Sequence, residues 1–379
     1  MAISLYIHFP FCGNICGYCD FYREKYDPGL EEQFFKALIM ELRLAKDTID
    51  PDRRLIETIY IGGGTPSLID FWHLKHLITM IREYFDLDPQ LEFSMEINPE
   101  SIDAEKLIAL KDMGINRPVF GIQSFDSYPL TRLGRIHNLK DSYRAVYLAG
   151  ANGFRNYGVD MMFGLPGQNS RRLSDDLNQL VDLAPPHISY YQLTVKPNSI
   201  LERDVRDGKI TLPDQDMMAS MYRAIHEELK KHSYIRYEIS SYAIPGFECR
   251  HNMNYWEGGD FLGLGPSAHS FIENRRFSNI PDLKKYIETI SRGERPLIFD
   301  TIDPESRIAE TIMLGLRTAR GIGREEFRNR FGVSVDQVID EKSLAAMLKE
   351  NLIDMDNNSL RLTESGFPLA DEIIRRLVK

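Results

Sequence analysis

Short apolar runs alternate with longer amphipathic stretches over the N-terminal half of the chain. Each run has the length and composition of a buried β-strand, and the runs cover 5–10, 58–62, 91–97, 118–123, 157–163 and 188–195. The intervening stretch 31–46 places Phe34, Leu38 and Leu42 on one face of a predicted helix. This alternation predicts βαβ units with right-handed crossovers around a parallel sheet.

Six such units form either an open, three-quarter (βα) barrel or a doubly wound sheet. In both folds a ligand binds at the carboxyl ends of the strands. We therefore predict an α/β fold with a parallel sheet for residues 1–235, either as the open barrel or as the doubly wound sheet. Its functional groups are expected in the loops that follow the strands.

Near residue 236 this pattern ends. Residues 255–266 are rich in glycine and aromatic side chains, and we interpret 236–299 as a connecting segment. From about residue 300 onward, three helices are predicted, followed by a hairpin that turns at two asparagines. These elements cover 306–316, 324–331, 335–350 and 353–362.

Three helices followed by a hairpin predict a small winged-helix-like domain at 300–379. Such a domain suggests DNA binding, but residues 301–379 contain 12 basic and 14 acidic side chains. Their net charge of about −2 does not supply the attraction to phosphates that DNA binding needs. We expect a domain that packs against the barrel or docks a partner.

The composition is that of a globular protein, with 43% hydrophobic and 27% charged residues. A net charge of −10 argues against a nucleic-acid partner. His8 and Pro10 interrupt the first apolar run, so it is not a signal peptide. No apolar run approaches the roughly 18 residues that cross a bilayer. We expect a cytoplasmic protein without a membrane anchor of its own.

Three of the four cysteines lie directly after the first predicted strand. Cys12, Cys16 and Cys19 form a CxxxCxxC loop, which can bind three irons of a [4Fe-4S] cluster and leave the fourth iron open for a small molecule. Zinc would need a fourth ligand in paired spacings, and disulfides do not suit a chain that is not secreted. Zinc and inert thiols are the alternatives. Cys249 is compatible with a plain buried thiol.

Three later strands each carry one polar residue among apolar neighbours: Glu96, Gln123 and Asp160. Burying a carboxylate without a partner is costly, so these side chains predict hydrogen bonds to one polar ligand. Arg135 would then bind a carboxylate of that ligand in bidentate fashion. The glycines of the sequence Gly-Gly-Gly-Thr-Pro at 62–66 let a ligand approach the backbone, although a structural turn explains them about as well.

These motifs resemble the radical S-adenosylmethionine proteins of the oxygen-independent coproporphyrinogen oxidase-like family, and within it the HemW-type haem chaperones. The resemblance spans nearly the whole chain. It rests on the cysteine loop, on Glu96, and on the sequences at 62–66, 121–125, 134–137, 160–168 and 248–256. It implies that residues 1–235 form a radical S-adenosylmethionine core, with the partial (βα)6 barrel as its fold.

The resemblance also implies that the amine and carboxylate of S-adenosylmethionine bind the open iron. The positions that match family contacts to this cofactor are Tyr6, Tyr18, Gly63, Gly64, Thr65, Glu96, Gln123, Arg135 and Asp160. In active relatives an electron from the cluster splits the sulfonium to give a 5′-deoxyadenosyl radical, so the cofactor carries the chemistry.

Two departures bear on whether the chain is an enzyme. The oxidases have a further cysteine where this chain has Phe21, and they have a long N-terminal arm, whereas this loop begins at residue 12. Both differences match the HemW branch. The sequence at 251–256, His-Asn-Met-Asn-Tyr-Trp, resembles a run associated with haem binding there, and an imidazole beside aromatic rings suits haem. The resemblance thus implies His251 as an axial ligand, with Cys249 as an alternative.

We therefore expect a haem chaperone that holds haem, a [4Fe-4S] cluster and S-adenosylmethionine, and passes haem to respiratory acceptor proteins. No catalytic residue is assigned. The alternative from the enzyme class is oxidative decarboxylation of coproporphyrinogen III, and a third option is a radical enzyme acting on an unrelated substrate. The sequence leaves the oligomeric state open, with a homodimer as one option.

Overall fold

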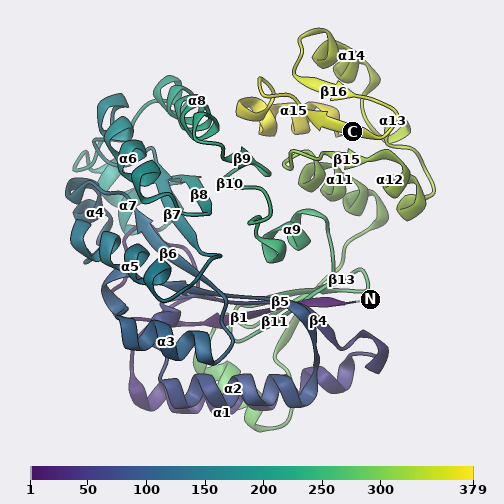
Figure 1. Cartoon of the computed structure of the whole chain (residues 1–379). Helices are drawn as coiled ribbons and strands as arrows, with labels where there is room; N and C mark the ends of the chain where they lie inside the picture. The colour runs from purple at the N-terminus through teal and green to yellow at the C-terminus, as the bar shows by residue number, and fades with distance from the viewer. Residues whose placement is uncertain (1, 379) are drawn as a thin grey trace.

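A computed structural model describes residues 2–378 and contains a sheet of 12 strands that curves around an inner face (Figure 1). Six neighbouring strands run parallel, and they confirm the predicted partial (βα)6 barrel. In sheet order they are β1 (Ile3–Phe9), β4 (Leu55–Gly63), β5 (Asp86–Ile97), β6 (Arg117–Gln123), β7 (Gly158–Phe163) and β8 (His187–Gln192).

Each parallel strand alternates between two environments. In β1 the side chains of Leu5, Ile7 and Phe9 are buried in the main hydrophobic core. The intervening Tyr6 pairs in register with Tyr60 of β4 and so belongs to the opposite, inner face. The barrel therefore has an apolar outer face and a polar inner face.

Helices cover the apolar outer face (Figure 1). The first of them, α1, begins after Asp27, whose side chain accepts a hydrogen bond from the Leu30 N–H, and Pro28 occupies its first turn. These helices are α1 (Pro28–Thr48), α2 (Phe71–Tyr84), α3 (Ala104–Asp112), α5 (Leu139–Ala151), α6 (Ser170–Leu183) and α8 (Gln215–Lys231). Two short helices, α4 (Ser127–Leu133) and α7 (Ile200–Arg206), pack in a separate hydrophobic cluster beside the cysteine loop.

Residues 236–299, expected as a connecting segment, extend the same sheet at both ends. Strand β10 pairs antiparallel with β8, and β11 pairs parallel with β1. The added elements are β9 (Ile235–Arg236), β10 (Ser241–Ala243), β11 (Phe261–Leu264), β12 (His269–Ile272), β13 (Arg275–Asn279), α10 (Leu283–Ser291) and β14 (Leu297–Asp300). A buried carboxylate, Glu41 of α1, accepts hydrogen bonds from Gly265 N at 2.9 Å and from the Tyr286 hydroxyl at 2.7 Å, which ties this segment to the barrel.

One helix of this segment lies on the inner side of the sheet. Helix α9 (Arg250–Trp256) sits on the face of the sheet opposite to α1 and α2 (Figure 1). It contacts β4 on one side and α11 of the C-terminal domain on the other. The sequence His-Asn-Met-Asn-Tyr-Trp is therefore placed between the barrel and the C-terminal domain.

The C-terminal domain has its own hydrophobic core. Its elements are α11 (Pro304–Gly315), β15 (Ile322–Gly323), α12 (Arg324–Phe331), α13 (Val335–Val338), α14 (Glu341–Lys349), β16 (Ile353–Met355), β17 (Ser359–Leu362) and α15 (Ala370–Leu377). The predicted hairpin is present as β16 and β17.

One predicted helix of this domain is wrong. Residues 335–350 form two helices, because Ile339 is extended and makes a β-bridge with Val378. Asp340 then caps α14 by accepting a hydrogen bond from Ser343 N at 2.7 Å. Among residues 2–378, no helix is both long and apolar enough to cross a bilayer.

Candidate functional site

A cavity of about 400 Å³ opens at the carboxyl ends of the parallel strands. Eleven of the residues singled out from the sequence line it together. They are Cys12, Cys16, Tyr18, Cys19, Gly63, Gly64, Thr65, Glu96, Gln123, Arg135 and Asp160. The topology thus brings the cysteine loop and the polar strand ends to one place.

The cysteine loop forms one wall of the cavity. Cys12 ends the short strand β2 (Phe11–Cys12), which pairs with β3 (Glu24–Lys25), whereas Cys16 and Cys19 lie in the turn between them and are half-buried. Burial raises the pKa of the Cys12 and Cys19 thiols above its usual value. Within residues 2–378 no group of three or more His, Cys, Asp or Glu side chains lies close enough together to hold a single metal ion.

The glycines of the 62–66 sequence fit against the cysteine loop. Gly64 N donates to Phe9 O at 2.7 Å, and Thr65 N donates to Phe11 O at 2.8 Å. A Cβ atom on Gly64 would lie 2.4 Å from Phe11 O, so no other residue fits there. Gly63 has φ +110°, which also favours glycine. The backbone at this turn is therefore exposed to the cavity without side chains in between.

Two carboxylates face the cavity from the inner face, Glu96 on β5 and Asp160 on β7. Glu96 accepts hydrogen bonds from the Tyr60 hydroxyl and from Gly63 N, both at 3.1 Å. Burial and the nearby Asp160 raise the pKa of Glu96 to about 7, and burial raises the pKa of Asp160 to about 6. The Oδ1 atom of Asp160 is buried without a hydrogen-bond partner. An unsatisfied buried acceptor beside a second carboxylate is suited to a ligand that carries donors or positive charge.

Gln123 and Arg135 complete the wall near Cys16. Gln123 has φ +68°, a strained conformation for a residue other than glycine and one often found at ligand sites. Arg135 donates to Gly121 O at 2.7 Å and to Asn98 Oδ1 at 3.2 Å, and its Nη1 lies 4.0 Å from Cys16 Sγ. These contacts hold a guanidinium group beside the cysteine loop.

Tyr6 does not line this cavity. Its hydroxyl donates to His8 Nδ1 at 3.0 Å, and His8 Nε2 donates to Tyr22 O at 2.8 Å. The ring of Tyr6 lies 6.3 Å from that of Tyr60, between centroids. Tyr6 therefore supports the inner face behind the cavity.

His251 lies at the opposite end of the barrel interior and is fully buried. Its Nδ1 is 2.7 Å from Thr58 Oγ1, and its Nε2 is 2.7 Å from the Tyr255 hydroxyl. Burial and the nearby Arg117 lower the pKa of His251 to about 3, so the imidazole is neutral. Both ring nitrogens are engaged, and the structure does not bring His251 into the cavity of the cysteines.

Several cavity residues were missed by the sequence analysis, among them Tyr60, Asn98 and Tyr191. Tyr60 and Tyr191 occupy inward positions of β4 and β8, and Asn98 directly follows β5. Period-two alternation along the strands is a signal that could identify the two tyrosines, but aromatic residues inside a strand suit an apolar core equally well.

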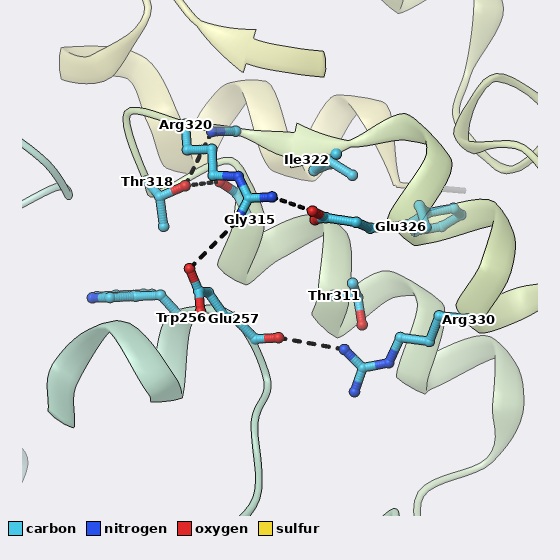
Figure 2. A pocket seen from close by; sticks show the side chains of 12 residues that line it. Trp256, Glu257, Thr311, Gly315, Thr318, Arg320, Ile322, Glu326 and Arg330 are labelled. Atoms are coloured by element: carbon cyan, nitrogen blue, oxygen red, sulfur yellow. Dashed lines mark hydrogen bonds and ion pairs between the residues drawn. The ribbon is translucent and has the colours of Figure 1, made fainter. Parts of the chain in front are cut away.

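The other end of α9 meets the C-terminal domain at a cavity of about 330 Å³ (Figure 2). Arg320 pairs with Glu257 at 3.6 Å and with Glu326, and Arg330 donates to Gly258 O at 3.1 Å. Trp256 lines the same cavity. These contacts fix the end of α9 against α12.

Comparison with known proteins gives consistent matches along the chain. Residues 6–180 match the model of the Radical SAM superfamily, and residues 302–369 match that of the HemN C-terminal domain. A Bacillus subtilis protein named heme chaperone HemW is 36% identical and covers 98% of this chain and 97% of its own length. Its Haemophilus influenzae namesake is 35% identical with the same coverage.

The fold also matches a solved structure. Coproporphyrinogen III oxidase (HemN) from Escherichia coli superposes with a TM-score of 0.86 at 22% sequence identity, covering 99% of this chain and 89% of the oxidase chain. This similarity extends over the barrel and the C-terminal domain and shows a shared fold.

Proposed function

The chain belongs to the HemW family, and from that premise we propose that it is a cytoplasmic haem chaperone that binds haem, a [4Fe-4S] cluster and S-adenosylmethionine and passes haem to respiratory acceptor proteins. The observation that carries this proposal is the 36% identity with a HemW protein across 98% of the chain. Phe21 supports the chaperone over the oxidase, because it stands 61% exposed at the cavity where the oxidases have a further cysteine.

The chemistry of the cavity residues fits a [4Fe-4S] cluster and S-adenosylmethionine. Cys12, Cys16 and Cys19 would ligate the cluster, and the guanidinium of Arg135 complements the negative charge of thiolates. Glu96, Asp160 and the exposed glycine backbone would hold S-adenosylmethionine. The unpartnered Asp160 Oδ1 is the observation that favours a ligand with donors. When bound, the cluster and S-adenosylmethionine supply one-electron chemistry.

For haem we propose His251 as an axial ligand. Its imidazole is neutral, as a ligand must be, and it is surrounded by aromatic rings, with Tyr60 at 5.2 Å and Tyr255 at 5.0 Å between centroids. Ligation requires that the hydrogen bond between Nε2 and the Tyr255 hydroxyl is released. Helix α9 must therefore shift from the position it has here.

The test is an anaerobic titration of cluster-loaded protein with hemin, followed by absorbance. We expect one haem per chain, at least tenfold weaker binding in His251→Ala, and unchanged binding in His232→Ala, whose ring is exposed at the end of α8. The haem-loaded protein should also transfer haem to a haem-free respiratory cytochrome. Absence of haem binding by the wild type contradicts the chaperone function, and unchanged affinity in His251→Ala removes this residue from the haem site.

The same preparation separates the oxidase from the chaperone. Reduced protein is incubated with S-adenosylmethionine and coproporphyrinogen III, and the products are analysed. We expect neither protoporphyrinogen nor carbon dioxide. Turnover of coproporphyrinogen III would favour the enzyme instead.

A further inference from the structure

One side chain, Tyr60, touches both of the sites that the proposed function requires. The ring of Tyr60 stacks on the imidazole of His251, with centroids 5.2 Å apart and planes inclined by 29°. Its hydroxyl donates to Glu96 Oε1 at 3.1 Å. The other oxygen of Glu96 accepts a hydrogen bond from Gly63 N, at the exposed glycine turn of the cavity, at 3.1 Å.

Close packing leaves Tyr60 and Glu96 little freedom to move independently. A Cβ atom on Gly62 would lie 2.9 Å from Glu96 Oε1 and 3.0 Å from Tyr60 Cε1, so both side chains press against this glycine. A change in the position of one is therefore transmitted to the other.

We propose that Tyr60 is a positioning residue that couples the two sites, so that S-adenosylmethionine in the cavity holds Tyr60 against His251 and thereby weakens haem binding. This inference rests on the proposed function, because it assumes that haem is ligated by His251 and that S-adenosylmethionine occupies the cavity. Ligation requires α9 to shift, and this shift moves the His251 imidazole relative to the Tyr60 ring on which it stacks. A more firmly held Tyr60 therefore opposes ligation.

The charge of the cofactor explains why the cavity affects Tyr60. S-adenosylmethionine bound through its amine and carboxylate still carries a positively charged sulfonium, and positive charge beside Glu96 and Asp160 favours their ionised forms. The pKa of Glu96, raised to about 7 by burial and by Asp160, means that part of the Glu96 population is protonated at neutral pH and releases its proton to solvent when a cation binds. An ionised carboxylate only accepts hydrogen bonds, so the Tyr60 hydroxyl must donate to it, in a stronger, charge-assisted bond.

The experiment measures haem affinity of cluster-loaded protein with and without saturating S-adenosylmethionine. Saturation is verified for each variant by isothermal titration calorimetry. In the wild type we expect S-adenosylmethionine to raise the haem Kd about fivefold or more, the range of typical coupling between sites. Tyr60→Phe keeps the aromatic ring and removes the hydroxyl, and the effect of S-adenosylmethionine should disappear. Tyr190→Phe is the matched control, because Tyr190 lies on the outer face of β8, in the hydrophobic core and away from both sites.

The coupling must also be reciprocal in the wild type, so haem should weaken S-adenosylmethionine binding by the same factor. This measurement tests the inference even if Tyr60→Phe fails to fold. Wild-type protein that binds haem equally with and without S-adenosylmethionine, or a Tyr60→Phe variant that keeps the full effect, overturns the inference and leaves the chaperone function intact. Wild-type protein that binds no haem in either condition overturns the proposed function, and the inference with it.

Discussion

Two glutamates four residues apart on the same strand show how differently the two ends of the barrel interior are built. Glu92 faces α9 and accepts hydrogen bonds from Arg250 N and His251 N, both at 3.0 Å, and a longer one from Cys249 Sγ at 3.6 Å. Glu96 faces the cavity and accepts from one hydroxyl and one backbone N–H. Both side chains project from the inner face of β5.

Burial alone therefore does not identify a ligand site. Glu92 is buried and its protein partners satisfy it, so that end of the barrel is closed by the chain itself. At the other end Asp160 Oδ1 lacks a partner and the pKa values of Glu96 and Asp160 are raised. A buried carboxylate oxygen without a donor, beside a second carboxylate with a raised pKa, marks the end where a ligand is needed to complete the structure.

The largest effect is expected when the carboxylate of Glu92 at the closed end is removed. Glu92→Ala leaves two backbone N–H groups of α9 without acceptors, and it deprives the fully buried Arg117 of a nearby negative charge. We expect the free energy of unfolding to fall by about 3–5 kcal/mol, the usual cost of breaking a buried charged contact. Denaturation by guanidinium chloride at pH 7 measures it.

Glu92→Gln is the control, because its amide oxygen still accepts a hydrogen bond. It should lose about 1–2 kcal/mol, less than the alanine variant. If Glu92→Ala unfolds within about 0.5 kcal/mol of the wild type, the closed end is not held by this carboxylate.

The cavity around Glu96, which is the open end of the barrel interior, was predictable from the sequence. The contacts of α9 around Glu92, at the closed end, were not. The alternation of apolar runs with amphipathic stretches predicted the parallel strands. Because the carboxyl ends of parallel strands meet at one edge, Glu96, Gln123 and Asp160 were expected to lie together. The contacts of α9 join His251 to Thr58 and Glu92, which are 193 and 159 residues away in the chain. No local pattern reports such pairings.

Two further features of the fold escaped the sequence for the same reason. Strand β11 pairs with β1 although more than 250 residues separate Ser4 from its partner Phe261. The helix predicted at 335–350 is interrupted because Ile339 pairs with Val378, near the end of the chain. In both cases a tertiary contact overrides the propensity of the segment.

The second prediction concerns the open end, where the substitution is expected to raise the free energy of unfolding instead of lowering it. Glu96 has a folded-state pKa of about 7, above the usual value near 4.5, so its ionisation destabilises the folded protein as the pH rises through that window. Glu96→Gln removes this charge. We expect the variant to match the wild type at about pH 4.5 and to be more stable by about 3 kcal/mol at pH 8 in the absence of ligand. Unfolding measured at both pH values tests it.

This result would sharpen the contrast between the two ends, because amide substitution would lower stability at Glu92 and raise it at Glu96. S-adenosylmethionine binding by Glu96→Gln should be weaker, since a cation loses a carboxylate partner. If Glu96→Gln is less stable than the wild type at pH 8, the open end is not under electrostatic strain.

The smallest effect is expected from the hydroxyl that covers the proposed haem-ligating nitrogen at the closed end. Thr58 Oγ1 donates to Ser4 Oγ at 2.8 Å, so it accepts from His251 Nδ1. The Tyr255 hydroxyl therefore donates to His251 Nε2 at 2.7 Å. The ring of Tyr255 packs edge-on against His251 and Phe261. Tyr255→Phe keeps these ring contacts and removes one buried hydrogen bond, which contributes about 1 kcal/mol. Because a haem iron competes for the same lone pair, hemin should bind Tyr255→Phe about fivefold more tightly, while the free energy of unfolding falls by a similar ~1 kcal/mol. Weaker hemin binding in this variant would show that the Tyr255 hydroxyl supports ligation instead of competing with it. Haem would then reach His251 without the loss of this contact at the closed end.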